Sequence, residues 1–451
     1  MQSSDRRSPQ PHFPAVLQAA AGSRLGGLLC FGLAVIGFAG FGLLTAPALA
    51  QSATTHATDT QKVEAETAAT TAAAEESAFL VWLAELRRDA LKEGISAATF
   101  DSAMAGVRPL PEVLERDRHQ PEFRLTFSNY LERAITDARV ERAQAMLAKH
   151  RDLLTAVERR YGVQPRFLVS FWALESNFGD HTGGFSVIEA LTTLAYDPRR
   201  SDFFRTQLLH ALKIIDEDHI AADDMTGSWA GAMGQLQFIP STFTGYAVDY
   251  DNDGSRNIWT SLPDVFASAA NFLKSEGWQG DRTWGREVRL PASFDWDLAG
   301  LATRKPLKEW QTLGLRRADG SALPRVDIEA SLILPAGHRG PAFLVYQNFR
   351  TILNWNRSIL YAIAVGHLAD RIAGQGPLTT KPGYSETALS RGDIEEIQAR
   401  LTALGYDAGR PDGIAGSRTR EALKQFQRQQ GSPADGYPTK ELLDALRRAG
   451  G

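Results

Sequence analysis

Hydrophobic residues recur every three or four positions over much of the chain between residues 77 and 374, which is the spacing of amphipathic helices. Two shorter stretches, 286–290 and 329–334, instead predict strands from their alternating character. The pattern therefore predicts a mostly α-helical domain with a few strands. The predicted helices cover residues 78–92, 126–149, 151–161, 165–176, 202–219, 264–276 and 355–373.

Two changes in composition divide the chain into domains. Residues 51–76 are rich in Ala, Thr and Gln and predict a flexible linker with little tendency to fold. Residues 374–387 contain three glycines and two prolines and predict a second linker. The main domain then covers residues 77–373. The remaining unit of about 60 residues, 388–449, is small but able to fold alone.

The N-terminal 50 residues have the features of an export signal. Basic residues, the last of them Arg24, precede an uncharged stretch from Leu25 to Ala50 that ends in a small-x-small cleavage site. This stretch is also long enough to span a bilayer, so an uncleaved N-terminal membrane anchor is the alternative. Leu29 is too large for the usual lipoprotein site before Cys30. In both cases we expect the bulk of the protein to lie outside the cytoplasm.

Composition narrows the function classes further. The 451 residues include 49 Lys and Arg against 53 Asp and Glu, a formal net charge of −4. The chain has no excess of basic residues, so its charge does not point to nucleic acid as a partner. Hydrophobic residues make up 43% of the chain, which supports a sizeable core. Because Cys30 is the only cysteine, no disulfide can form within the chain, and stability must come from packing.

The first segment with candidate chemistry places a carboxyl group at a helix end. Pro165 suits a first helical position, and Asn177 and Gly179 are plausible terminators, so Glu175 falls in the last turn. The helix dipole and apolar neighbours both disfavour an anion there and raise the carboxyl pKa. A protonated carboxyl group can act as a general acid near neutral pH. The alternative is a solvated glutamate at a helix end.

A second segment, 228–243, combines glycines with carboxamide side chains. Gly231 and Gly234 allow close approach of another backbone or a ligand. Gln235 and Gln237 carry donors and acceptors suited to sugar hydroxyls and N-acetyl groups. The alternative is a tight helix–helix contact made by small residues.

A third segment, 249–264, has carboxylates at alternate positions. Asp249, Asp251 and Asp253, followed by Gly254, fit the first, third, fifth and sixth positions of an EF-hand-type loop. Hard cations prefer such oxygen ligands, and calcium fits better than magnesium. The alternative is an Asp-rich surface turn.

The later positions of this loop depart from the EF-hand pattern. Ser255 would contribute its backbone carbonyl, as the seventh position does. The twelfth position is Thr260 rather than the usual glutamate. Asp264 could supply a late carboxylate if the loop is longer than usual.

Taken in order, these segments resemble the membrane-bound lytic murein transglycosylase B family. The resemblance covers most of residues 77–373 and implies a lysozyme-like, α-rich fold that cleaves the glycan strands of peptidoglycan. Each motif alone is weak, but several in the right order are specific. The matching segments are 173–179, 191–200, 228–241, the loop that begins at Asp249, and 348–358.

The resemblance implies roles for particular residues. Glu175 falls on the family's single catalytic acid, and Ser228 and Gln237 fall on polar residues that line the cleft beside it. Asn356 and Tyr361 fall on a later cleft wall. The placement of Tyr130 on an aromatic sugar-stacking residue rests on spacing alone.

Two departures from the family pattern concern the cleft wall and the metal loop. Some relatives have a tyrosine where Trp355 stands. The loop resembles the family's calcium site, but one extra residue precedes its last ligand. The implied ligands of one structural Ca²⁺ are Asp249, Asp251, Asp253, Ser255 and Asp264.

The implied reaction needs one carboxyl group where most glycosidases use two. In the family, the protonated glutamate gives its proton to the leaving glycosidic oxygen. The carboxylate then takes a proton from the 6-hydroxyl of the same N-acetylmuramic acid, which attacks its own anomeric carbon and forms a 1,6-anhydro ring. No organic cofactor is needed.

The C-terminal unit resembles the three-helix peptidoglycan-binding domain often attached to wall enzymes. The resemblance covers the whole unit, with Gly405 at the end of its first helix and Thr419 near the start of the next. Its aliphatic and aromatic residues are expected in a small core. These residues are Ile394, Ile397, Leu401, Leu404, Leu423 and Phe426.

Two other functions remain open at this stage. One is a hydrolytic muramidase that uses water as nucleophile in the same cleft, and the other is a non-catalytic wall-binding protein. We favour a periplasmic, monomeric transglycosylase that acts on peptidoglycan glycan strands and does not bind nucleic acid.

Overall fold

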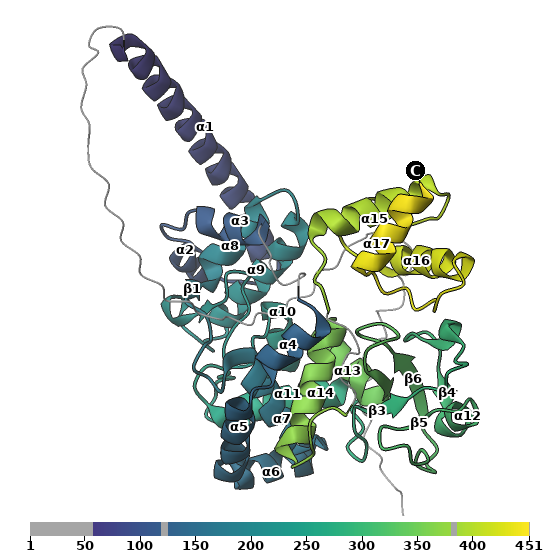
Figure 1. The fold of residues 1–451 in the computed structure, drawn as a ribbon. Coiled ribbons are helices and arrows are strands. Elements are labelled where there is room, and N and C mark those ends of the chain that lie inside the picture. Colours follow the sequence, from purple (N-terminus) through teal and green to yellow (C-terminus); the bar gives the residue numbers. More distant parts are fainter. Residues whose placement is uncertain (1–56, 119–124, 380–385, 451) are drawn as a thin grey trace, which may run out of the picture.

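The computed structural model describes residues 57–118, 125–379 and 386–450 (Figure 1). The predicted signal or anchor, 1–50, lies outside these ranges. Within them, no helix combines the length and the apolar character needed to cross a membrane.

Helices form most of the main domain, as predicted. Several of them pack against α7, whose Phe167, Leu168 and Phe171 are fully buried. Helices α5, α6, α11 and α14 contact α7. The helices are α1 (Ala57–Lys92), α2 (Ala97–Ala103), α3 (Pro111–Arg118), α4 (Phe127–Ala134), α5 (Asp137–Lys149), α6 (Arg151–Tyr161), α7 (Pro165–Ser176), α8 (Val187–Tyr196), α9 (Ser201–Asp216), α10 (Pro240–Tyr246), α11 (Leu262–Ser275), α13 (Gln347–Trp355) and α14 (Ile359–Ile372).

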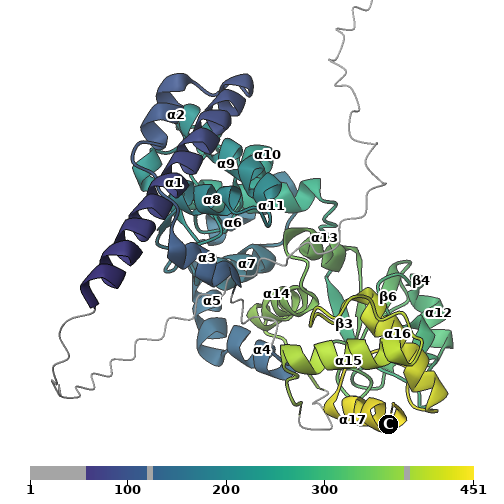
Figure 2. The same cartoon turned by 90° about the horizontal axis from the view of Figure 1, so that it is seen from above.

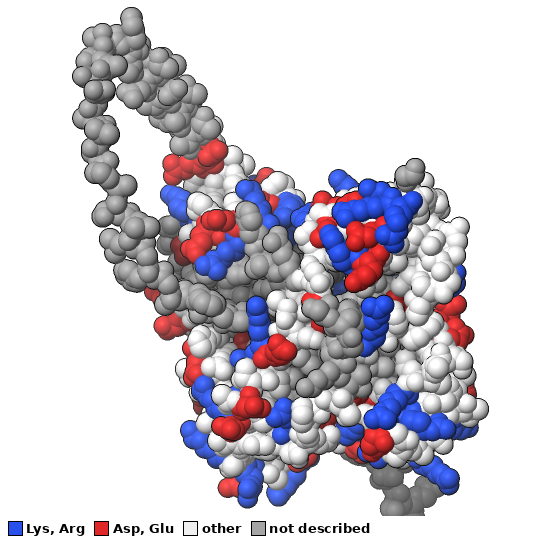
Figure 3. Space-filling view, in the orientation of Figure 1, with Lys and Arg blue, Asp and Glu red and all other residues white. Residues whose placement is uncertain are grey.

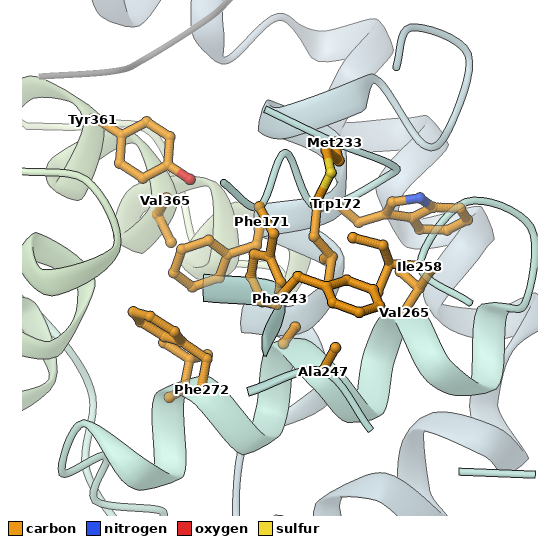
Figure 4. Close-up of a cluster of buried hydrophobic side chains, with 14 of the residues drawn as sticks. Phe171, Trp172, Met233, Phe243, Ala247, Ile258, Val265, Phe272, Tyr361 and Val365 are labelled. Carbon is orange, nitrogen blue, oxygen red and sulfur yellow. The ribbon is translucent and has the colours of Figure 1, made fainter. Parts of the chain in front are cut away.

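One hydrophobic core extends through this helical body. Figure 4 shows part of it, where Phe171, Phe243 and Phe272 from three helices belong to one cluster of buried side chains. A buried hydrogen bond from Ser170 Oγ to the carbonyl of Val365 (2.7 Å) joins α7 to α14. These two helices carry Glu175 and Tyr361, which meet at the candidate site.

Two antiparallel sheets accompany the helices. A small one pairs β1 (Phe185–Ser186) with β2 (Thr226–Gly227). A five-stranded sheet, in the order β4-β6-β7-β3-β5, is inserted between α11 and α13 and has a separate core around Trp310 of α12 (Leu307–Thr312). Its strands are β3 (Gly285–Arg289), β4 (Lys305–Pro306), β5 (Arg316–Arg317), β6 (Glu329–Ile333) and β7 (Ala342–Val345).

The C-terminal unit is a three-helix domain, as predicted, made of α15 (Arg391–Ala403), α16 (Ser417–Gln429) and α17 (Lys440–Ala449). Gly405 has the left-handed conformation (φ 87°) that ends α15. The domain lies beside the five-stranded sheet (Figure 2). Contacts between them include His338 Nδ1 to Asp435 (2.6 Å) and Lys424 Nζ to the carbonyl of Ala299 (3.3 Å).

Several predicted boundaries are wrong. The helix predicted over 126–149 is two helices, because Ile135 leaves the helical conformation and Thr136 caps α5 by accepting from Arg139 N. The helix predicted over 355–373 begins at Ile359, where Ser358 supplies the cap. The strands predicted at 286–290 and 329–334 are confirmed to within one residue as β3 and β6.

The first predicted linker also differs from the structure. Helix α1 begins at Ala57, so residues 57–76 are helical rather than an irregular linker. Ala and Glu, which are frequent there, have high helix propensity, and the chain continues without a break into the packed part of α1. In Figure 1 the N-terminal half of α1 projects away from the body.

Candidate active site

Glu175 lies where the sequence predicts, in the last turn of α7. Pro165 opens the helix, and Asn177 closes it with a left-handed backbone (φ 51°). Gly179 follows with φ 86°, and a Cβ there would lie 2.6 Å from Gln235 Oε1. Gly179 therefore lets the chain turn close to Gln235 a few residues after Glu175.

The Glu175 side chain is buried and hydrogen-bonded through one oxygen. The residue is 9% exposed. Its Oε1 accepts from Trp355 Nε1 (2.9 Å) and, through a very short hydrogen bond, from the Tyr361 hydroxyl. Burial raises the pKa of Glu175 from 4.5 to about 7, against the opposing effect of these two donors. The predicted pKa rise is confirmed, and the solvated-glutamate alternative is wrong.

Both donors are held by their surroundings. The Trp355 ring packs against Phe171 (4.4 Å between ring centroids), Phe272 (5.0 Å) and Phe238 (5.1 Å). Tyr361 is 4% exposed, and burial, with the nearby Glu175 charge, raises its pKa well above 10. Tyr361 therefore stays a hydrogen-bond donor at neutral pH. Figure 4 shows its hydroxyl directed toward the aromatic cluster.

Sequence reasoning missed the contact between Trp355 and Glu175. It identified Trp355 only as a departure from the family pattern. The sequence feature that could have indicated this contact is the position of Trp355 in the 348–358 segment, next to Asn356. Among the described residues, no second carboxylate contributes to the raised pKa of Glu175.

Residues 228–239 of the second segment form a loop stabilised by its own side chains, and α10 begins at Pro240. Ser228 is buried, and its Oγ accepts from the backbone N–H groups of Ala232 (3.0 Å) and Ala230 (3.3 Å). Gln237 Nε2 donates to the carbonyls of Thr182 and Gly234, both at 2.9 Å. No partner for Gln237 Oε1 occurs in the described part of the chain.

The glycines of this loop and Gln235 serve packing. A Cβ on Gly231 would meet Leu191 of α8 at 2.4 Å, and one on Gly234 would meet the carbonyl of Ile258 at 2.7 Å. Gln235 accepts from Trp172 Nε1 (2.7 Å) and donates to the carbonyl of Trp259 (2.8 Å). Gly231 and Gly234 therefore allow close approach to other parts of the chain. The predicted alternative of a contact between two helices is not what the structure shows.

Two other predicted residues lie close to this group. Asn356 is 3% exposed and follows Trp355 at the end of α13, where its Oδ1 accepts from Ser358 N (3.0 Å). Tyr130 on α4 is half-buried and close enough to Tyr361 to raise its pKa. The structure therefore brings residues from α4, α7, α13 and α14 to the same region.

Three of the five predicted metal ligands form a cluster. One carboxylate oxygen each from Asp249, Asp251 and Asp264 lie within 4.8 Å of one another. Asp264 is fully buried and accepts from the N–H groups of Tyr250 (2.7 Å) and Asn257 (2.8 Å). Burial raises the pKa of Asp264 and the two neighbouring carboxylates add to this, while the N–H donors oppose it.

The other two predicted ligands lie outside this cluster. Asp253 is exposed and accepts from Ser255 N (2.8 Å), and Ser255 Oγ donates to the carbonyl of His219 (3.1 Å). The three clustered carboxylates form a donor set that suits a hard divalent cation such as Ca²⁺.

Comparison with known families gives two matches along the chain. A model described as "Transglycosylase SLT domain" matches residues 78–370, and one described as "Putative peptidoglycan binding domain" matches residues 390–446. Both matched regions agree with the domains seen in the structure.

A curated relative is membrane-bound lytic murein transglycosylase B of Escherichia coli (strain K12). It is 30% identical over 257 residues, which cover 54% of this chain and 66% of the relative, slightly less than two thirds of its length.

Two solved structures are also similar. SltB3 from Pseudomonas aeruginosa, in complex with NAG-NAM-pentapeptide, is 51% identical with a TM-score of 0.80, over 82% of this chain and 99% of that one. Escherichia coli SLT35, in complex with calcium, is 26% identical with a TM-score of 0.57, over 64% of this chain and 92% of that one.

Proposed function

The chain belongs to the lytic murein transglycosylase family and carries a peptidoglycan-binding domain, and from this premise we propose that it cleaves the β-1,4 bond between N-acetylmuramic acid and N-acetylglucosamine in peptidoglycan. The products would carry 1,6-anhydro-N-acetylmuramic acid ends. The observation that supports this most directly is Glu175, a buried carboxyl group with a pKa of about 7.

The hydrogen bonds to Glu175 indicate which oxygen carries the proton. Trp355 and Tyr361 both donate to Oε1, and within the described residues nothing is bonded to Oε2. The proton therefore resides on Oε2 and passes from there to the leaving glycosidic oxygen. The two donors then stabilise the new carboxylate, because hydrogen bonds to a charged acceptor are stronger.

The same carboxylate completes the reaction as a base. It takes the proton of the 6-hydroxyl of N-acetylmuramic acid while that oxygen bonds to the anomeric carbon and the glycosidic bond breaks. This step returns Glu175 to its protonated form and consumes no water. A nucleophile that belongs to the substrate is already positioned, so a second carboxylate is not needed.

We assign substrate positioning to the remaining predicted residues. Gln237 has its amide nitrogen fixed by two carbonyls, which leaves its Oε1 to accept a hydrogen bond from a sugar N–H or hydroxyl. Ser228 and Asn356 contribute polar groups to the same cleft. Tyr130 provides a ring for a sugar to stack on.

We also propose one structural Ca²⁺ held by Asp249, Asp251 and Asp264, with Asp253 and Ser255 as further predicted ligands. The clustered carboxylates support this assignment. When bound, the ion would offset the mutual repulsion of these carboxylates at the start of α11. No chemical step involves it, and no organic cofactor is required.

The proposed setting is the periplasm, with the protein acting as a monomer. Residues 1–50 would direct export or anchor the protein to the membrane. The C-terminal domain would hold the enzyme on peptidoglycan glycan strands while the main domain cleaves them.

Mass spectrometry of digested peptidoglycan tests the reaction and its main alternative together. We expect anhydro ends from the wild type, whereas a hydrolytic muramidase would release reducing ends. Glu175→Gln should lower the rate by about 10²–10⁴-fold or more, because the amide cannot donate the proton. Glu141→Gln, an exposed glutamate on α5, is the control. Wild-type turnover by Glu175→Gln would remove this residue from the mechanism.

A further inference from the structure

A hollow lies outside the Glu175 site, where the five-stranded sheet meets the helical body. It is a cavity of about 270 Å³ between residues 279–282, 327–331 and 345–350, with Arg304 at its edge. Arg304 and Glu329 are exposed, so solvent and ligands have access to it.

One wall of this cavity is held rigidly by a buried asparagine. Asn348 is fully buried, and its Nδ2 donates to the carbonyls of Gln279 (2.9 Å) and Arg282 (3.0 Å). Its Oδ1 accepts from Gln279 N (2.7 Å). Gln164 Nε2 also donates to the carbonyl of Arg282 (2.9 Å). The lining is therefore pre-formed rather than a gap between mobile loops.

Two guanidinium groups provide a positive side. Arg350 Nη2 donates to the carbonyl of Leu301 (2.5 Å) and to Ser331 Oγ (2.8 Å), which fixes its orientation. Burial and, next, the nearby charge of Arg304 lower the pKa of Arg350, while the charge of Glu329 opposes this. Arg304 itself forms no hydrogen bond or ion pair with any described residue. Arg304 and Arg350 form the basic part of the lining, which favours an anionic group of a ligand.

Carboxylate and carboxamide groups provide the rest of the lining. Asp327 and Glu329 line the same cavity, and in the described ranges neither side chain is paired. The side chains of Gln279 and Gln347 also lack hydrogen-bond partners there. The cavity thus offers acceptors for an ammonium group, donors for a carboxylate and amides for a peptide backbone.

The cavity lies within reach of Glu175 along one helix. Gln347 lines the cavity at the start of α13, and Trp355 at its end donates to Glu175. Eight residues of α-helix span about 12 Å. An extended pentapeptide spans up to about 17 Å. A sugar at Glu175 could therefore carry a peptide whose far end reaches the cavity.

Building on the proposed function, we propose that this cavity binds the charged end of the peptide attached to the glycan strand. The ligand class is a peptide segment with a free carboxylate and a free ammonium group. Arg304 and Arg350 would bind the carboxylate, and Asp327 and Glu329 the ammonium.

Direct binding of a peptide tests this proposal. The probe is the free pentapeptide released from peptidoglycan by an amidase, measured by calorimetry with Glu175→Gln protein to prevent turnover. We expect Arg304→Ala and Glu329→Gln each to weaken binding about fivefold, or about 1 kcal/mol. Arg325→Ala, an exposed arginine in the same segment outside the lining, should change it less than about twofold. Absence of binding, or equal binding by all variants, would overturn the proposal.

Kinetics with two substrates separate this proposal from the proposed function. The single variant Arg304→Ala, which retains Glu175, should show a raised KM on peptide-bearing glycan strands. Its KM on the same strands stripped of peptide should be unchanged. Its kcat should be unchanged on both substrates. Equal effects on both substrates would mean that Arg304 does not recognise peptide. If no variant cleaves either substrate but the peptide still binds through Arg304, the proposed function fails and the cavity assignment stands.

Discussion

At the scale of single residues, the environment of Glu175 balances two opposing effects on one carboxyl group. Burial favours the neutral acid, whereas hydrogen bonds from Trp355 and Tyr361 favour the carboxylate. The balance gives a pKa of about 7, so each form is accessible near neutral pH. A group that must first donate a proton and then accept one works best in this range.

Trp355→Phe should move the falling limb of the pH–rate profile to higher pH. Activity requires protonated Glu175, so the rate falls as pH rises through its pKa. The indole N–H stabilises the carboxylate, and its removal should raise that pKa by about one unit. Trp278→Phe, which removes an indole hydrogen bond to Gln164 instead, is the control. An unchanged profile for Trp355→Phe would mean that this hydrogen bond does not tune Glu175.

Glu175→Gln should also change how stability depends on pH. The folded pKa of about 7 lies above the ordinary 4.5, so the wild type is not destabilised below pH 4.5 and loses stability as pH rises toward 7. The total loss is about 3 kcal/mol, and glutamine does not incur it. Denaturant unfolding should therefore show that the free energy of unfolding of Glu175→Gln increases relative to that of the wild type between pH 4.5 and pH 8. The same difference in free energy of unfolding at both pH values would contradict this prediction. The control Glu141→Gln should differ from the wild type by the same amount at both pH values.

At the scale of elements, the loop before α11 brings three carboxylates within 4.8 Å of one another. Asp264 is buried at the N-terminus of α11, where Ser261 caps the helix, and Asp249 and Asp251 lie beside it. Helix dipole and backbone donors favour one carboxylate there, but three clustered carboxylates repel one another. A divalent cation would relieve this repulsion.

Calcium should therefore stabilise the protein through this loop. At a concentration of 100 times Kd, we expect about 2.7 kcal/mol, seen as a rise in Tm that a chelator reverses. Asp251→Asn should reduce the response. Asp223→Asn, an exposed aspartate outside the cluster, should keep it. If neither calcium nor a chelator changes the Tm of the wild type, a cation site in this loop is excluded.

At the scale of the whole molecule, the C-terminal domain has its own core and a polar contact with the sheet. Leu401, Leu423 and Leu446 are fully buried within that domain, while its contacts to the sheet include ion pairs such as those of His338 and Arg428. On the face in Figure 3, basic and acidic side chains are interspersed over both parts. The hydrophobic cores of the two domains are therefore separate.

A chain that ends at Thr379 should therefore keep its catalytic activity. We expect rates on soluble peptidoglycan fragments within about twofold of the full-length protein, because every residue of the candidate site is retained and the main domain has its own hydrophobic core. Retention on insoluble peptidoglycan, measured by pelleting, should fall strongly. The isolated domain, 388–451, is the converse control and should pellet without cleaving. Equal pelleting by the truncated and full-length proteins would contradict a binding role for this domain.

Much of the fold could be predicted because it depends on local patterns. The bounds of α6 and α7, the end of α15 at Gly405 and the strands β3 and β6 follow from periodicity and terminating residues. The break between α4 and α5 could not be predicted from periodicity. It depends on Thr136, whose capping hydrogen bond competes with a continuous helix that hydrophobic spacing alone would favour.

The sequence by itself determined that Glu175 ends an apolar helix, because helix start, helix end and apolar spacing are all encoded within fifteen residues. Only the tertiary structure decided what surrounds that carboxyl group. Trp355 and Tyr361 lie 180 and 186 residues away along the chain, and packing of α13 and α14 against α7 brings them to a single oxygen. Local patterns specify helices, but desolvation and hydrogen bonding of a buried acid depend on which distant helices cover it.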